Sequence, residues 1–185
     1  MLGLLERVKA IMMTPQTEWP AVAAESSNAL ALRYTAILAV IPVLARLIGG
    51  WLIGGYTPLP AALVGAVAGY ALSLVTVFAV ALAVDLLAPR FGGARSYSSA
   101  LRLTAYAFTP VWLAGIFLVV PGASFLVLLG LYGLYLVWLG APVLMQMPQE
   151  RALIYVMAIA ACAIVLDVAA WLALIAVMNY GASST

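Results

Sequence analysis

The chain has 185 residues, of which 67% are hydrophobic and 8% charged, and its net charge at pH 7 is +2. Soluble domains carry about 25% charged residues, so this composition excludes an ordinary soluble globular protein and predicts a membrane-embedded one. The slight positive balance calls for no nucleic-acid partner.

Residues 1–29 form the most polar part of the chain and are expected to contain an amphipathic helix. One face of that helix carries the apolar residues Leu4, Leu5, Val8, Ile11 and Met12. The helix could lie in the headgroup region or pack on the cytoplasmic end of the protein, and the pattern does not separate the two. Pro15 ends the helix. Trp19, just before Pro20, is expected at the membrane interface, where tryptophans gather.

Residues 30–185 are expected to form one membrane domain. Five apolar stretches are long enough to cross a hydrocarbon layer of about 30 Å, at residues 30–53, 60–88, 98–120, 123–145 and 152–178. No charged residue occurs between 103 and 149, and Pro121-Gly122 marks the turn inside that run. The predicted fold class is therefore all-α, a polytopic five-helix transmembrane bundle with a short amphipathic N-terminal segment.

Proline and glycine punctuate these stretches. Pro60 can start the second span and Pro89 can stop it. Three further prolines lie within or near the ends of spans and are expected to kink them: Pro42, Pro110 and Pro142. Small residues at helical spacing let helices approach closely, and they occur as Gly65 with Gly69 and as Gly130, Gly133 and Gly140.

Basic residues collect in the cytoplasmic loops of membrane proteins, and here they alternate between loops. They occur before or at the start of the first span, in the second loop and in the fourth, as Arg7, Lys9, Arg33, Arg90, Arg95, Arg102 and Arg151. The loop near Tyr56, the turn at Pro121 and the C-terminal tail carry none. This pattern predicts a multi-pass membrane protein with a cytoplasmic N-terminus and an outside C-terminus.

Four charges fall within or at the ends of spans: Arg46, Asp85, Arg102 and Asp167. At a rise of 1.5 Å per residue, Arg46 and Asp167 each lie about 15 residues, or roughly 22 Å, from the cytoplasmic end. Asp85 and Arg102 lie at that end. The charges therefore sort into two level-matched pairs, Arg46–Asp167 and Asp85–Arg102. The interpretation we favour is mutual neutralisation that fixes helix contacts; the functional one makes Asp167 a proton or cation site. Periodicity does not show whether Arg46 contacts Asp167.

A set of short motifs gives the chain a family resemblance. Their order and spacing resemble bacterial members of the Yip family, five-span proteins whose eukaryotic relatives are named for interacting with Ypt/Rab GTPases. The positions that carry the resemblance are Pro15, Trp19, Asp85, Pro89, Gly92, Tyr106, Pro110, Tyr132, Tyr135, Gly140 and Pro142. The resemblance implies a fold and a location, the bacterial inner (cytoplasmic) membrane, more than an activity.

Catalytic chemistry has few candidates in this chain. It contains no histidine, a single cysteine (Cys162), no serine beside a base and no glycine-rich phosphate loop followed by lysine. We therefore predict no enzyme, no metal and no cofactor.

The function expected from the sequence is a non-enzymatic membrane scaffold or adaptor in contact with membrane lipids and a protein partner at the cytoplasmic face. The alternative is a small transporter, channel or lipid-handling protein with a polar interior centred on Asp167 and Arg46. Homo-oligomerisation stays open under both.

Overall fold

The computed structural model describes residues 3–55, 58–120 and 122–183, with side chains to Ala176. In that part of the chain five helical segments are long and apolar enough to cross a membrane: Ala29–Ile53, Leu59–Phe91, Tyr97–Val119, Ser124–Leu144 and Gln149–Ala176. No strand occurs among the described residues. The predicted all-α, five-span fold class is confirmed.

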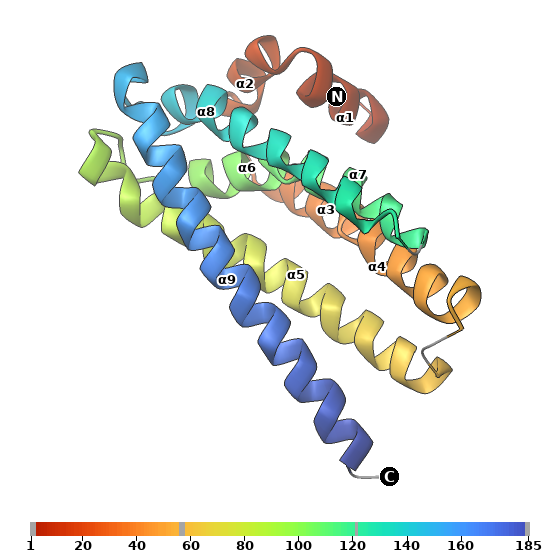
Figure 1. The fold of residues 1–185 in the computed structure, drawn as a ribbon. Helices are drawn as coiled ribbons and strands as arrows, with labels where there is room; N and C mark the ends of the chain where they lie inside the picture. The colour runs from red at the N-terminus through yellow and green to blue at the C-terminus, as the bar shows by residue number, and fades with distance from the viewer. Residues whose placement is uncertain (1–2, 56–57, 121, 184–185) are drawn as a thin grey trace.

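The N-terminal segment folds as two short helices that pack on the bundle. These are α1 (Leu4–Met13) and α2 (Pro15–Ala23), with Pro15 opening α2. Helix α2 packs on α8 (Tyr132–Leu144) and α1 contacts α7 (Thr109–Ala114), on the side of the bundle away from α9 (Figure 1). Ile11 and Trp19 are fully buried. The prediction that Trp19 lies at the interface is therefore wrong, because its indole is part of the protein core.

Three of the five spans are interrupted within their length. The first consists of α3 (Ala29–Leu38), α4 (Val40–Leu47) and the π-helical turn η1 (Ile48–Ile53). The third consists of α6 (Tyr97–Ala107), α7 and the 3-10 helix η3 (Gly115–Val119), and the fourth starts with the 3-10 helix η4 (Ser124–Leu131) before α8.

Two of the predicted kinks explain where these breaks fall. The first span breaks at Ala39, ahead of Pro42, and the third at Phe108, ahead of Pro110. A proline lacks the N–H and crowds the carbonyl four residues earlier, so a helix breaks just before it. Pro142 differs, since it lies inside α8 near the end of that helix.

The second and fifth spans are long helices that pack at one end and separate at the other. Helix α5 (Leu59–Leu87) continues into the 3-10 helix η2 (Ala88–Phe91), and α9 runs from Gln149 to Ser183. All buried residues of α5 lie from Val77 onward, and on α9 none lies in 160–176. Figure 1 shows the two helices diverging toward the C-terminus of α9. We call the two ends the packed half and the open half.

The loops of the packed half are tied together by backbone contacts. Gly92 adopts a φ of +81° after η2, which glycine tolerates best, and Ala94 N–H donates to the carbonyl of Met145 at 2.7 Å. A Cβ on Gly93 would lie 2.9 Å from that same Met145 oxygen. At the other end of the molecule Gly122, with φ +92°, belongs to the predicted turn between the third and fourth spans; Pro121 falls outside the described residues.

Candidate functional site: an intramembrane cavity and a buried polar cluster

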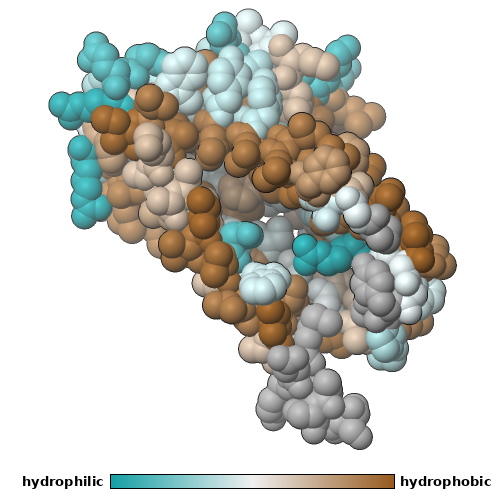
Figure 2. All heavy atoms as spheres, in the orientation of Figure 1, coloured by the Kyte–Doolittle hydropathy of each residue, from teal (hydrophilic) through white to brown (hydrophobic). Residues whose placement is uncertain are grey.

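A cavity of about 630 Å³ lies in the open half of the bundle. Its walls come from α4 and η1 of the first span, from the first two-thirds of α5, from α7 and η3, and from α9. Figure 2 shows a hollow on this face of the molecule with hydrophilic residues around it. The cavity exists because α5 and α9 separate there, leaving no side chains that fill the space between them and the first and third spans.

The polar lining of this cavity comes from four side chains on three helices. Arg46 lies on α4, Ser73 and Thr76 on α5, and Asp167 on α9. The two charges that the sequence places at one level thus line a single cavity. Both are exposed, and no ion pair within 4.0 Å joins them among the described residues. The sequence left contact between Arg46 and Asp167 open, and the favoured interpretation of a mutually neutralising pair has no ion pair behind it in the described part of the chain.

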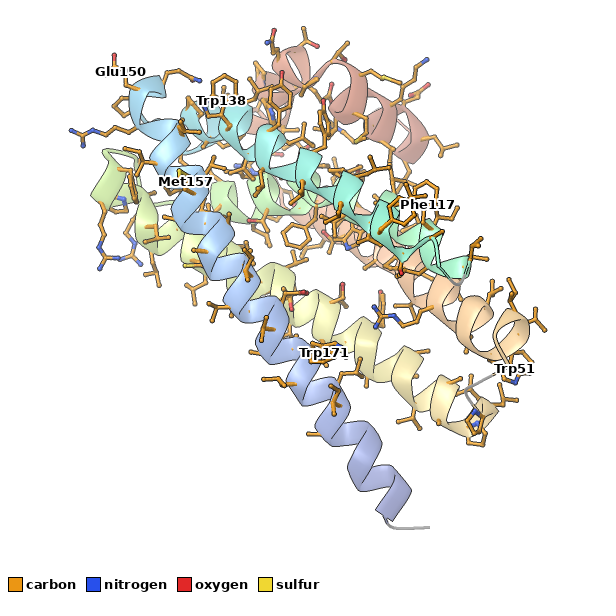
Figure 3. All side chains as sticks on the ribbon, in the orientation of Figure 1. Trp51, Phe117, Trp138, Glu150, Met157 and Trp171 are labelled. Carbon is orange, nitrogen blue, oxygen red and sulfur yellow. The ribbon has the colours of Figure 1, made fainter. Side chains whose placement is uncertain are left out.

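The rest of the lining is apolar and rich in aromatic rings. Trp51, Phe108, Trp112 and Trp171 contribute to the walls. Figure 3 shows Trp171 on α9 beside the space that separates α9 from α5, and Trp51 at the far end of the first span. Trp171 follows Asp167 by four residues and therefore shares its helix face. A carboxylate and an indole consequently face the cavity together.

The glycines of α5 and α8 have opposite roles. Gly65 and Gly69 both line the cavity, and a Cβ on Gly69 would meet no atom within 4 Å, so Gly69 does not bring helices into contact. On α8 the prediction of close packing is correct. A Cβ on Gly133 would lie 2.6 Å from the Ala107 carbonyl, and one on Gly140 would lie 2.6 Å from Leu103 Cδ1.

The predicted pair between Asp85 and Arg102 is wrong. Asp85, 5% exposed, accepts hydrogen bonds at Oδ2 from Arg95 at 3.4 Å. Arg102 donates instead to backbone carbonyls, those of Val22 at 3.3 Å and of Glu25. These carbonyls lie at and just beyond the end of α2, where a helix leaves its last carbonyls without partners. Docking of the N-terminal segment against α6 thus supplies Arg102 with acceptors.

A second polar site, which sequence reasoning missed, lies where the N-terminal segment meets the third span. Arg7 pairs with Glu18 and with Glu25, the latter at 2.9 Å. Tyr106 donates to Glu25 Oε1 at 3.1 Å, and the Arg7 guanidinium lies 5.5 Å from the centre of the Tyr106 ring. Burial raises the pKa of the Glu25 carboxyl above its ordinary value of 4.5, against the opposing effect of Arg7. We call Arg7, Glu18, Glu25, Arg102 and Tyr106 the polar cluster.

The polar cluster continues inward through hydroxyl groups. Thr109 Oγ1 donates to the Tyr106 carbonyl at 2.6 Å, and the Tyr34 hydroxyl lies 2.7 Å from the same Oγ1. Since Thr109 has one hydroxyl proton, Tyr34 is the donor of that second bond. Pro110 has no N–H to donate to the Tyr106 carbonyl, which lies four residues earlier in the helix. The hydrogen bond from Thr109 gives that carbonyl a partner. Arg102 and Tyr106 stand out in the sequence, but their link to Arg7 and Glu25 could not be predicted, because charged residues in a polar N-terminal segment are typical of a solvated surface.

Several of the motif positions behind the family resemblance meet at this same junction. Trp19 packs over Gly140, whose Cβ would lie 2.7 Å from the indole, and Tyr132 donates to the Met12 carbonyl at 3.1 Å. Tyr106 belongs to the polar cluster. These positions attach α1 and α2 to the bundle, and none of them lines the cavity. Tyr135 stacks between Tyr132 and Trp138 on α8, with ring centres 5.3 and 5.9 Å away.

Comparison with known proteins gives one family. The Yip1 domain model matches residues 9–172, which include Arg46 and Asp167 of the cavity and all of the polar cluster except Arg7. No curated protein and no solved structure matches the chain.

Proposed function

Because the chain belongs to the Yip1 domain family, whose members are membrane proteins, we propose that it is a non-enzymatic lipid-handling protein that holds an amphiphilic molecule in the intramembrane cavity. The observation that carries the proposal is a cavity of about 630 Å³ with one cation, Arg46, and one anion, Asp167, in walls that are apolar and aromatic apart from the hydroxyls of Ser73 and Thr76. This volume falls within the roughly 300–1,000 Å³ of small-molecule sites.

The position of the charges supports a ligand. A charged side chain at membrane depth is costly and is expected to pair, to face a polar interior or to serve a ligand. Arg46 and Asp167 lack a protein ion-pair partner among the described residues. An amphiphile whose polar group enters the cavity would give both of them partners.

The packed half argues against an open channel that conducts solutes through the bundle. Beyond the cavity the space between helices is filled by fully or almost fully buried side chains, among them Val77, Val84 and Leu103. A polar path would need to continue through this region to reach the other face. The cavity is therefore a one-sided site, which suits binding of a membrane component better than conduction.

A scaffold role is a second candidate, and the loops of the packed half favour it. Arg90, Arg95, Glu150 and Arg151 are exposed there, and we propose that this half faces the cytoplasm, where basic loops collect. An acidic protein surface or anionic lipid headgroups could bind these loops. The N-terminal helices are less suited to partner binding, because Ile11 and Trp19 are used within the bundle.

Native mass spectrometry of the full chain, purified from membranes in mild detergent, tests the lipid-handling proposal. We expect lipid adducts on the parent protein and their loss in Gly69→Phe, which fills the cavity from a position where a Cβ meets no atom. Val67→Phe is the matched control, since Val67 lies on the same helix but is 72% exposed and outside the cavity lining. Equal adducts on the parent and on both variants would contradict the proposal.

A further inference from the structure

We propose that the cavity selects a phospholipid with a zwitterionic headgroup that bears a primary ammonium, with Arg46 binding the phosphate and Asp167 the ammonium group. This inference rests on the proposed lipid-handling function and names its ligand class. It concerns the side chains that line the cavity and is independent of the loops of the packed half.

The first argument is charge balance. Among the residues that the structure describes, Arg46 and Asp167 are the only lysine, arginine, aspartate or glutamate side chains in the cavity lining. The cavity walls therefore carry no net charge but hold both signs. A zwitterion complements this pattern, whereas an anionic lipid would bring its negative charge toward Asp167 with no ammonium group to neutralise it.

The second argument is the position and chemistry of the two groups. Arg46 lies on α4 and Asp167 on α9, so the charges come from different walls of one cavity. A guanidinium offers a planar set of N–H donors that matches phosphate oxygens. A carboxylate accepts hydrogen bonds from the three N–H groups of a primary ammonium, while a quaternary ammonium has none to donate. This difference favours a primary amine at Asp167.

The third argument concerns the acyl chains. The flanks of the cavity on α5 and α9 expose large apolar side chains, including Leu63 at 48%, Val168 at 51% and Leu172 at 56%. Acyl chains can lie along these helices in the bilayer while the headgroup occupies the cavity. Because the packed half closes the other end, we expect the lipid to be held and not to be moved across the membrane.

The test is a lipid titration of the full chain in detergent, followed by native mass spectrometry, with three synthetic phospholipids that share the same acyl chains. Their headgroups are phosphoethanolamine, phosphocholine and phosphoglycerol. For the parent we expect the phosphoethanolamine lipid to bind about tenfold or more tightly than the phosphoglycerol lipid, the scale of one charge-assisted hydrogen bond. Asp167→Asn should remove this preference and Arg46→Gln should weaken binding of all three lipids. Arg33→Gln, an exposed arginine outside the cavity lining, is the control and should behave as the parent.

Three outcomes would overturn the headgroup assignment. One is equal affinity of the parent for the phosphoethanolamine and phosphoglycerol lipids, and another is an unchanged preference in Asp167→Asn. The third is stronger binding of the phosphocholine lipid, which would indicate that Trp51 and Trp171 recognise the ammonium group by cation–π contact. None of the three outcomes shows by itself where the lipid binds. Failure of the proposed function itself is distinguishable, because Gly69→Phe and Val67→Phe would then carry equal adducts. Asp167→Glu, which keeps the carboxylate, should retain the preference and guards against a merely structural effect of the asparagine.

Discussion

At the scale of single residues, the polar cluster puts two glutamates and two arginines into contact at the edge of the bundle. The Glu25 carboxylate pairs with Arg7 and accepts a hydrogen bond from the Tyr106 hydroxyl. Arg102 donates to the Glu25 backbone carbonyl, and the Arg7 guanidinium also pairs with Glu18. The Glu25 side chain is 8% exposed. Such a group has lost most of its water, so its ionisation couples to the stability of the fold.

This coupling predicts a pH dependence. A carboxyl whose pKa is raised in the folded protein favours folding when protonated, so its contribution to stability is lost as the pH rises above 4.5 through the raised pKa of Glu25. We therefore expect the melting temperature of Glu25→Gln, relative to that of the parent, to increase as the pH rises from 4.5 to 8. Thermal unfolding in detergent across this range measures it, with Glu150→Gln, an exposed glutamate, as control. A difference between the Glu25→Gln protein and the parent that does not vary with pH would refute the coupling.

Glycine positions make a second prediction at this scale. A Cβ on Gly140 would lie 2.6 Å from Leu103 Cδ1 and 2.7 Å from the Trp19 ring, whereas Gly69 has open space. We expect Gly140→Val to lower the free energy of unfolding by about 1–3 kcal/mol through overpacking. Gly69→Ala should leave it unchanged or raise it by up to about 1 kcal/mol, because alanine favours helix over glycine. Melting temperatures of the two variants in one detergent decide the matter; equal losses would show that the tight contact at Gly140 is absent.

Residue partners were only partly predictable from the sequence. Counting residues along helices was enough to place Arg46 and Asp167 at one level, and they line one cavity. The same counting failed for Asp85 and Arg102, because their partners depend on the path of the α5–α6 loop and on where α2 docks. Helical spacing fixes the depth of a side chain, but it does not specify which neighbour that side chain faces.

At the scale of elements, the N-terminal helices are part of the fold. Trp19 is fully buried where α2 packs on α8, with its ring over Gly140, and the Tyr132 hydroxyl of α8 donates to the Met12 carbonyl. We expect Trp19→Ala to lower the free energy of unfolding by about 3–5 kcal/mol, the usual cost of removing a large buried aromatic side chain. It should also speed tryptic cleavage at Lys9 in limited proteolysis. Trp51→Ala is the control, because Trp51 is 40% exposed. Wild-type cleavage rates in Trp19→Ala would mean that the segment is held without this contact.

The elements themselves were largely predictable. All five spans occur close to the expected ranges, since the bilayer sets their length and charged residues mark their ends. The positions of the breaks within the first and third spans were harder to predict. Proline indicated a kink, but the breaks fall at Ala39 and Phe108, upstream of the prolines. The burial of α1 and α2 was not predictable, because an amphipathic pattern is the same for a helix that faces lipid and for one that faces protein.

At the scale of the whole molecule, one half is closely packed and the other contains the cavity. In a membrane, this asymmetry places the cavity toward one of the two faces. The proposed orientation puts the packed half and its basic loops in the cytoplasm and the cavity toward the outside. Ser98 starts the third span in the packed half, and Ser124 starts the fourth in the open half.

Those two serines test the orientation. In a Cys162→Ala background, Ser124→Cys should react with a membrane-impermeant maleimide added to intact cells or spheroplasts. Ser98→Cys should react only after the membrane is permeabilised. Mass-tag labelling measured on gels is sufficient, and the opposite pattern would place the N-terminus and the packed half outside.

The central claim is that Arg46 and Asp167 serve a ligand and do not clamp α4 to α9. Thermal unfolding of delipidated protein in mild detergent tests it most directly, for Arg46→Gln, Asp167→Asn and the double exchange Arg46→Asp with Asp167→Arg. Both side chains are exposed and no ion pair within 4.0 Å joins them in the described part of the chain. We therefore predict that all three variants melt close to the parent when delipidated, and that added phosphoethanolamine lipid stabilises the parent more than any of the variants. Early melting of both single variants, with recovery in the double exchange, would identify a structural ion pair and contradict the account.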